Sequence, residues 1–434
     1  MAKLSDILGM NARSADFLFL NKKSARKRAD DKLLTKRMLR RTHVPHPKLL
    51  GVLKDARGVR DFDWGKLTGG FVIKPVQGFG GQGIILIKRP AKEEGMFWTV
   101  EEKKVSAGDL VLHAVDIVEG KYSHNNLPDK AMIEERITIH PKFKKLAVGG
   151  APDVRVIVFN KIPVMAMLRL PTEESGGKAN LHQGAIGLGI DMATGITTHG
   201  VYKNSQLKYF PDTNKKVNGI TVPYWNKILL MATKTQRISH LPYLSVDMLI
   251  DRDRGPVVLE LNDQPGLSIQ LANMTGLRRR LQRVEGLEVE SSEKGVKISK
   301  ALFASKFANR VAYLGEDKPV LGIFESIKVR TGKKKWVEVP CKIDTGARST
   351  SIDQSLALEL GLLIPENVLW IKKVKNSLGF EERTMIAITF KLKGRVIRTR
   401  ASLTNRVNLR RQFLIGRRDL KEYMVDPAII IKRR

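Results

Sequence analysis

The stretch VVLELNDQPG, residues 257–266, places polar side chains inside an apolar strand. Residues 257–259 are typical of a core strand, and Glu260 and Asn262 follow two positions apart, so both side chains point to one face of the sheet. A buried carboxylate without a partner costs several kcal/mol. The chain must therefore fold so that Glu260 meets an Arg or Lys, a proton or a metal ion.

A second strand with an inward acid precedes this one. The stretch LPYLSVDMLIDRDRG predicts a strand over residues 245–250 and a turn over 251–255, which places Asp247 beside Glu260. Two carboxylates and the amide oxygen of Asn262 suit Mg²⁺, which prefers oxygen ligands. An acid pair neutralised by Arg or Lys fits the same residues, so this stretch alone leaves both interpretations open.

The net charge indicates an anionic partner. Lys and Arg number 77 against 44 Asp and Glu, which gives +33. Such an excess favours binding to nucleic acid, a ribosome, anionic lipid or an acidic peptide. The basic clusters, such as KSARKR and NLRRQFLIGRRDL, hold few aromatic residues, so they do not predict a base-stacking module.

Residue usage is that of a globular protein in a reducing compartment. The 434 residues, 42% of them hydrophobic, are enough for two or three domains. No apolar run approaches the roughly 18 residues that span a bilayer, and the basic N-terminal stretch lacks the apolar core of a signal peptide. Cys341 is the only cysteine, so no intramolecular disulfide forms. We expect a cytoplasmic protein without a membrane span.

A glycine-rich hairpin lies nearer the N-terminus. The stretch GGFVIKPVQGFGGQGIILIKRP predicts a strand over 71–75, a loop containing the glycines at 78–83, and a strand over 84–88. Dinucleotide and Walker loops need a helix after the glycines, so both are excluded. The loop could cradle phosphates with backbone N–H groups, assisted by Lys74, although a plain flexible hairpin has the same pattern. Lys32 begins a predicted helix over 31–41.

Further charged positions mark strand ends. A strand over 131–133 ends in Glu134-Glu135, and Arg169 ends the strand that follows Asp153-x-Arg155. A single helix is expected within residues 266–286, and another helix followed by a linker after it. From about residue 320 the chain turns to short strands, which predicts a separate, mostly β domain.

The ordered motifs together resemble the ATP-grasp superfamily, most of all its RimK-like alpha-L-glutamate ligases, over roughly residues 5–285. The resemblance is carried by Asp31-Lys32, Lys74 before the glycine hairpin, Glu134-Glu135, Asp153-x-Arg155, NLHQG, Asp247 and Glu260-x-Asn262. It implies that ATP phosphorylates a carboxylate to an acyl phosphate, which an amine then attacks to form an amide.

The resemblance also assigns roles to residues. It implies ATP and Mg²⁺ as cofactors, with Mn²⁺ able to replace Mg²⁺, and glutamate or a similar amino acid joined to a peptide or protein. The basic surface, rather than the resemblance, favours an acidic acceptor. Gln183 stands where the family's better-known members carry Arg. The nucleotide is assigned to Lys32, Lys74, Gly78, Gly80, Gly81, Gly83, Glu134, Glu135 and Arg136, the metal ions to Asp247, Glu260 and Asn262, and the reacting groups to Arg155, Arg169, Asn180 and His182.

A second resemblance covers about residues 318–434. CKIDTGARSTSI, followed by FLIGRRDL, is similar to retropepsin-like domains of the type labelled ATP-dependent zinc proteases. Aspartic proteolysis needs two carboxylates that share a proton, so Asp344 would act only in a homodimer. Every histidine lies before residue 241, so a His/Cys zinc site cannot form in this domain. Asp344 as a catalytic acid and Asp344 as part of a binding-only barrel are both open.

The sequence thus predicts an α+β chain in which an ATP-grasp fold of antiparallel sheets and helices precedes a small, mostly β retropepsin-like barrel. The expected parts are a lead-in with the first ATP lysine (1–65), the ligase domain (66–285), a helical linker (286–317) and the barrel (318–434). The expected function is a Mg²⁺/ATP-dependent carboxylate–amine ligase. The alternatives are a catalytically silent module that binds ATP or a polyanion, and an aspartic peptidase using Asp344 with a regulatory ATP-grasp domain.

Overall fold

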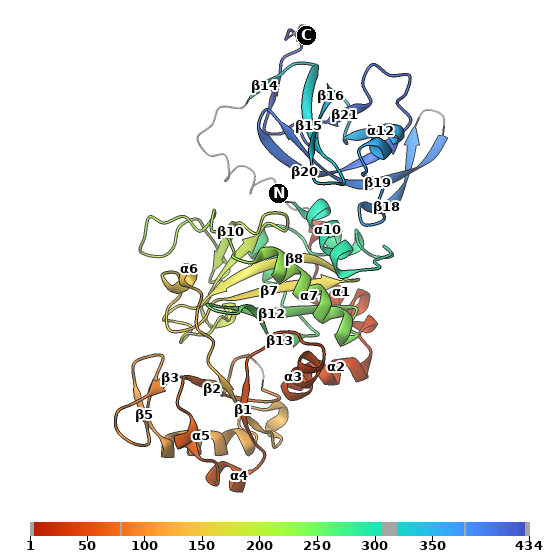
Figure 1. The fold of residues 1–434 in the computed structure, drawn as a ribbon. Coiled ribbons are helices and arrows are strands. Elements are labelled where there is room, and N and C mark those ends of the chain that lie inside the picture. The colour runs from red at the N-terminus through yellow and green to blue at the C-terminus, as the bar shows by residue number, and fades with distance from the viewer. Residues whose placement is uncertain (1–3, 79, 305–318, 377–378, 430–434) are drawn as a thin grey trace. The chain divides into compact units, whose positions relative to one another are not determined.

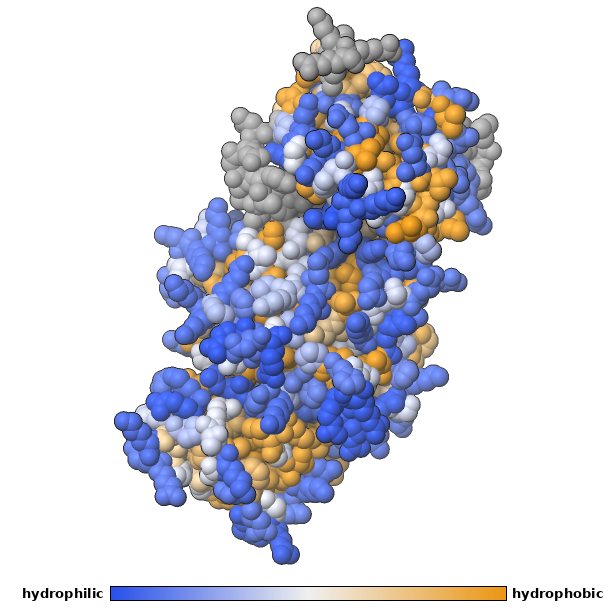
Figure 2. Space-filling view, in the orientation of Figure 1, coloured by the Kyte–Doolittle hydropathy of each residue, from blue (hydrophilic) through white to orange (hydrophobic). Residues whose placement is uncertain are grey.

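The computed structural model describes residues 4–78, 80–304, 319–376 and 379–429. Two compact units divide the chain, Met1–Glu285 and Gly286–Arg434 (Figure 1). Hydrophilic side chains cover much of the face drawn in Figure 2, as the +33 net charge leads one to expect. Within the described ranges, no helix is both long and apolar enough to cross a bilayer.

Unit 1 begins with short helices, α1 (Met10–Asp16), α2 (Lys23–Asp30) and α3 (Lys32–Arg41). Asp31 caps α3 by accepting hydrogen bonds from the backbone N–H groups of Leu33 and Leu34, which fixes the start of the predicted helix. Both α2 and α3 pack against strand β13 and helix α7, described below. The start of α3, with Lys32 as its first residue, is therefore fixed by this cap and by the packing of the helix.

The first sheet of unit 1 is six-stranded and antiparallel. Helix α5 (Ala107–Val118), which starts with a capping box at Ser106, packs on β2 and β6 and buries Leu110 and Ile117 against Phe71 and Ile73. In sheet order the strands are β1 (Leu49–Leu53), β6 (Ala131–Glu135), β2 (Phe71–Pro75), β3 (Ile85–Pro90), β4 (Met96–Thr99) and β5 (Lys104–Ser106).

The second sheet is seven-stranded, again antiparallel. Helix α7 (Trp225–Ser239) packs on β7, β8 and β12, while α8 (Ile269–Asn273) lies on β8, β9 and β10. Gly189 allows this approach, because a Cβ there would meet the carbonyl oxygen of Ala272 at 2.3 Å. In sheet order the strands are β11 (Ser205–Leu207), β10 (Thr197–Tyr202), β9 (Ile186–Ile190), β8 (Ile162–Leu170), β7 (Asp153–Phe159), β12 (Tyr243–Asp251) and β13 (Gly255–Asn262).

The hairpin of β12 and β13 has the predicted register. Asp247 lies opposite Glu260, so the predicted neighbouring of these two acids is confirmed. The next pair is Met248 with Val258, which leaves Leu259 as an extra residue on β13. This bulge shifts the alternation of β13 and turns Glu260 and Asn262 onto the face of Asp247.

The single helix expected within residues 266–286 was wrong. The structure has two short helices there, α8 and α9 (Arg278–Gln282). Met274 ends α8 in a left-handed conformation with φ of 48°. Gly276 lies so close to the N-terminal segment that a Cβ would meet the carbonyl oxygen of Asp6 at 2.0 Å. Tertiary packing against residues far away in sequence therefore interrupts the helix.

Unit 2 is a small barrel with helices. Pairing of β15 with β19 closes the sheet, so β15, β16, β21, β17, β20 and β19 form a ring, and β18 continues beyond β19. Helix α10 (Ser292–Phe303), in the predicted linker, packs on β18 and β20; residues 305–317 of that linker lie outside the described residues. The barrel elements are β15 (Phe324–Arg330), β16 (Trp336–Asp344), β17 (Ser351–Asp353), α12 (Gln354–Glu359), β18 (Val368–Asn376), β19 (Gly379–Leu392), β20 (Arg395–Thr404) and β21 (Phe413–Gly416), beside the pair β14 (Val320–Leu321) and β22 (Met424–Val425).

The predicted fold class is confirmed. Unit 1 consists of two antiparallel sheets with helices, and unit 2 is a small β barrel whose core includes Phe390, Phe413 and the buried Cys341.

Candidate active site

Charged residues gather on one face of the seven-stranded sheet. Asp247 of β12 lies directly between Arg155 of β7 and Glu260 of β13, and Asp153 of β7 lies opposite Arg169 of β8. Cross-strand partners and residues two apart share a face, so all five side chains project to the same side. Three neighbouring strand pairings therefore build the site.

Arg155 and Arg169 form ion pairs with the aspartates of this face. Arg155 donates from Nε to Oδ1 of Asp247 at 2.8 Å and from Nη2 to Oδ2 at 2.6 Å. Arg169 donates to Oδ2 of the same carboxylate at 2.6 Å and also pairs with Asp153. Burial alone would raise the pKa of Asp247, whose side chain is 0% exposed, but the two guanidinium groups hold it well below its usual range. For Asp153 burial dominates and raises the pKa.

These contacts limit which of the predicted metal ligands can bind a cation. Three hydrogen bonds from Arg155 and Arg169 occupy both oxygens of Asp247, so only one of its roughly four lone-pair positions, on Oδ1, is left for a cation. The interpretation of an acid neutralised by Arg thus holds for Asp247. It does not hold for Glu260.

Glu260 is the acid left open. It is partly exposed and makes neither a hydrogen bond nor an ion pair with any residue in the described ranges, although its charge acts on Lys32 and Arg169. The amide oxygen of Asn262, on the same face, accepts from the N–H of Gln264 at 2.8 Å. Because Glu260 is partly exposed, its carboxylate oxygens remain open to water or to a bound cation.

A lysine cluster lies on the six-stranded sheet. Lys74 of β2 and Lys36 of α3 both form ion pairs with the buried carboxylate of Glu134 on β6. Burial opposes ionisation of Glu134, but Lys74 and Lys36 outweigh it and lower the pKa of the carboxyl. Burial also lowers the pKa of Lys36. Lys36 was not predicted, although it lies one helical turn after Lys32, where a side chain shares the same face.

Lys32 and the glycine loop are in contact. Lys32 donates from Nζ to the carbonyl oxygens of Val76 at 3.1 Å and Gly78 at 2.8 Å, and burial lowers its pKa. Three glycines of this loop have φ values that favour glycine, 63° at Gly80, 78° at Gly81 and 68° at Gly83. The predicted lysine and the predicted loop are thus brought together.

The glycine loop is also tied to the NLHQG segment. The carbonyl oxygen of Gly80 accepts from Nδ2 of Asn180 and from Nε2 of Gln183, both at 3.0 Å. Asn180 further accepts from the N–H of His182, whose side chain is exposed. Gln183, the residue that departs from the usual Arg, therefore helps to hold the loop.

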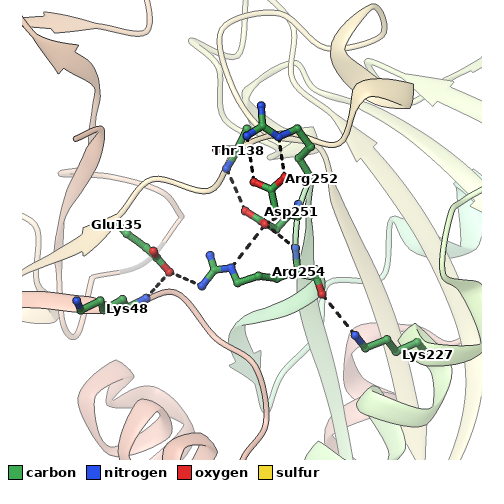
Figure 3. A network of polar contacts seen from close by, with 8 residues as sticks. Lys48, Glu135, Thr138, Lys227, Asp251, Arg252 and Arg254 are labelled. Atoms are coloured by element: carbon green, nitrogen blue, oxygen red, sulfur yellow. Dashed lines mark hydrogen bonds and ion pairs between the residues drawn. The ribbon is translucent and has the colours of Figure 1, made fainter.

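Glu135 and Arg136 face a different network. Glu135 accepts from the N–H of Lys48 and from Nη1 of Arg254, both at 2.7 Å, and Arg254 also pairs with Asp251. Figure 3 shows how these contacts join the end of β6 to the turn between β12 and β13. The N–H of Arg136 bonds the carbonyl of Gly70, and burial lowers the pKa of its guanidinium. Glu134 and Glu135, adjacent in sequence, therefore serve separate contacts.

Asp344 belongs to unit 2. Its Oδ1 accepts from the N–H groups of Gly346 at 3.0 Å and Ala347 at 2.9 Å. Asp344 pairs in register with Gly416, where a Cβ would meet the backbone of Ser349 at 2.5 Å.

The described part of the chain holds no group of three or more His, Cys, Asp or Glu that could bind a metal.

Comparison with known families decides the assignment. The model of the family described as "Sugar-transfer associated ATP-grasp" matches residues 12–286. The chain belongs to this ATP-grasp family. Unit 1 accordingly has the ATP-grasp fold, as predicted, and ATP and Mg²⁺ are the cofactors of ATP-grasp ligases. No curated protein matches the sequence.

Solved structures give distant similarities. The ATP-grasp ligase PsnB complexed with its minimal precursor is 16% identical, with 57% of this chain and 56% of that chain covered and a TM-score of 0.30. D-cycloserine synthetase DcsG is 15% identical, with 63% and 78% covered and a TM-score of 0.35. Lpg0085 from Legionella pneumophila, of unknown function, is 19% identical over 26% of this chain and 96% of its own, with a TM-score of 0.18. This chain thus spans little more than half of the PsnB chain.

Proposed function

We propose that the protein is an ADP-forming carboxylate–amine ligase of the RimK-like kind. A carboxylate oxygen of one substrate attacks the γ-phosphorus of ATP, which yields an acyl phosphate and ADP. An amine then attacks the acyl carbon, forms the amide and releases phosphate and a proton. The observation that carries the proposal is Glu260, a partly exposed carboxylate opposite Asp247 that has no partner among the described residues, in a chain of the ATP-grasp family.

The residues fit a divalent cation. Glu260 and Asn262 present oxygen atoms on one face of β13, both partly exposed, and such ligands suit Mg²⁺. Asp247 would join them through the remaining lone pair of Oδ1, or through both oxygens if Arg155 and Arg169 released them. When bound, Mg²⁺ neutralises charge on the nucleotide phosphates.

The lysines and the glycine loop would hold the nucleotide. Lys32 and Lys74 supply positive charge, and Lys36 with Glu134 fixes the position of Lys74. The backbone of the glycine loop is held at Gly80 by Asn180, so the loop is placed to keep water from an acyl phosphate. Arg155 and Arg169, oriented by their aspartates, are suited to hold an anionic reacting group.

The identity of the substrates is the finer part of the proposal. We propose that the amino acid is glutamate or a similar one and that the acceptor is a peptide or protein, with an acidic acceptor favoured by the +33 charge. The test measures ADP release with ATP, Mg²⁺ and single amino acids, with and without an acidic peptide. Glutamate-dependent release that Glu260→Gln abolishes supports the proposal. The matched control is Glu119→Gln, an exposed carboxylate at the residue that follows α5.

ATP binding without turnover on any amino acid would contradict the ligase. The protein would then be a silent nucleotide-binding module. Strong, salt-dependent binding to polyanions would accompany that result.

A second activity is proposed for unit 2 as a retropepsin-like domain. Asp344 sits in a tight loop with its Oδ1 fixed by two backbone N–H groups, beside the close approach of Gly416. Because two such carboxylates must share a proton, the active form would be a homodimer. Peptide cleavage that Asp344→Asn abolishes is the expected result, and undiminished cleavage in that variant would end the proposal.

A further inference from the structure

A pocket lies where the N-terminal helices meet the segment that leaves β13. One of its lining residues, Gln264, follows Asn262 of the candidate active site by two residues. None of its lining residues has been assigned to that site. Its lining includes Leu18, Phe19, Asn21, Lys23, Arg26 and Gln264.

The floor of the pocket is held firmly. Asn21 donates from Nδ2 to the carbonyl oxygens of Tyr243 at 2.7 Å and Asp263 at 3.2 Å, and its Oδ1 accepts from the N–H of Tyr243. Arg13 donates to the carbonyl of Pro265 at 2.9 Å. The N-terminal segment is therefore bonded to the start of β12 and to the residues that follow β13, which fixes one side of this open pocket.

The charge of the lining is positive. Lys23 and Arg26 line the pocket, and no acidic residue is among the described lining residues. Arg26 pairs with the nearby Asp263 through Nε at 2.5 Å, a contact that does not use its two terminal nitrogens. A planar anion suits that remaining edge of a guanidinium.

The apolar part of the lining comes from adjacent residues. Leu18 is buried, whereas Phe19 is 67% exposed, an unusual position for a large aromatic side chain. Together with the two cations, this exposed ring gives the pocket an apolar wall and a charged one. Ligand sites commonly have this composition.

The pocket lies close to Asn262, one of the proposed metal ligands. Gln264 lines the pocket and donates its N–H to Oδ1 of Asn262 at 2.8 Å. Two residues span at most about 7 Å. A molecule held in the pocket could therefore reach Asn262, and Glu260 lies four residues, at most about 14 Å of chain, from Gln264.

We propose that this pocket binds the acceptor substrate of the ligation through a second anionic group, separate from the carboxylate that is activated. The class of acceptor is thus a dicarboxylate or an acidic peptide residue, with its aliphatic or aromatic part on Phe19. That the bound molecule is the acceptor of the ligation rests on the proposed function. The anion-binding site itself is testable without turnover.

The experiment measures binding by calorimetry, with Mg²⁺ and a non-hydrolysable ATP analogue present. The probes are N-acetylglutamate, which has two carboxylates, and N-acetylglutamine, which has one. The variant is Lys23→Glu, and the matched control is Arg28→Glu, an exposed position on the same helix outside the pocket. We expect N-acetylglutamate to bind the wild type about tenfold more tightly than N-acetylglutamine, and Lys23→Glu to lose this preference. Arg28→Glu should keep it.

Other outcomes overturn the inference. Equal affinity for both probes in the wild type, or an equal loss in both variants, would mean that the pocket has no specific anion site. Tighter binding of a diamine such as putrescine would assign the pocket to an amine instead. If Lys23→Glu does not fold, Lys23→Gln is compared with Arg28→Gln in the same way.

The failure of one proposal is distinguishable from the failure of the other. ADP release that Glu260→Gln does not affect would remove the ligase but leave the probe preference intact. Loss of ADP release in Glu260→Gln, together with no effect of Lys23→Glu on probe binding, would remove the pocket and leave the ligase.

Discussion

Two regions of the seven-stranded sheet differ in whether their acidic side chains are paired with cations. On β7, β8 and β12, Asp247 is enclosed by Arg155 and Arg169, and every oxygen of its carboxylate has a partner. On the adjoining β13, Glu260 is partly exposed and has no partner among the described residues. The closed cluster fixes the geometry of the strands, and the open carboxylate of Glu260 is the proposed position of the cation. The distinction rests on the exposure of each carboxylate and on the number of cations in direct contact with it.

The largest expected effect comes from opening the closed cluster. Asp247→Asn removes the carboxylate that neutralises two buried guanidinium groups, and breaking a buried pair costs about 3–5 kcal/mol in the free energy of unfolding. Denaturant titration measures it. The control, Asp253→Asn, removes an exposed partner of Arg252 and should change stability by less than about 1 kcal/mol. Similar values for the two variants would show that the cluster is not the closed structure described here.

The lysine cluster provides the next test. Lys36→Met leaves Glu134 with Lys74 as its remaining lysine partner and should lower the free energy of unfolding by about 1–3 kcal/mol. Arg37→Met, at the next and exposed position of α3, is the control and should have little effect. If both variants are equally stable, the ion pair of Lys36 with Glu134 does not contribute to the free energy of unfolding.

The response to acid should follow Glu134. Its pKa is lowered in the folded state, so its contribution to stability is present above the unfolded value of about 4.3 and is lost as pH falls through the folded pKa. Glu134→Gln removes this titration. We therefore expect the free energy of unfolding of the wild type to fall more between pH 5 and pH 3 than that of the variant. Parallel pH profiles would contradict the assignment.

The smallest effect is expected at the contacts of Figure 3. Arg254 is 44% exposed and Glu135 29% exposed where they pair, so Arg254→Ala should cost no more than about 1 kcal/mol, and less in high salt. Unfolding at low and high salt measures this. A loss as large as that of Asp247→Asn would mean that the link between the two sheets, rather than the Asp247 cluster, is the critical electrostatic contact.

Local pattern predicted the hairpin but not the partners of its acids. The spacing of Asp247, Glu260 and Asn262 was readable because strand alternation is a local property. The pairing of Asp247 with Arg155 depends on the register of strands 92 residues apart, which no local pattern contains. Likewise, the break after α8 at Met274 follows from packing near Asp6. Lys36, by contrast, could have been found from its helical spacing after Lys32.

The central claim is that Glu260 is the open acid that holds the cation for ATP. The most direct measurement is the affinity for ADP as a function of Mg²⁺ concentration, by calorimetry, in the wild type and in Glu260→Gln, with Glu119→Gln as control. We expect Mg²⁺ to tighten ADP binding in the wild type and in Glu119→Gln, and to have at least about tenfold less effect in Glu260→Gln. An equal response to Mg²⁺ in Glu260→Gln would contradict the claim.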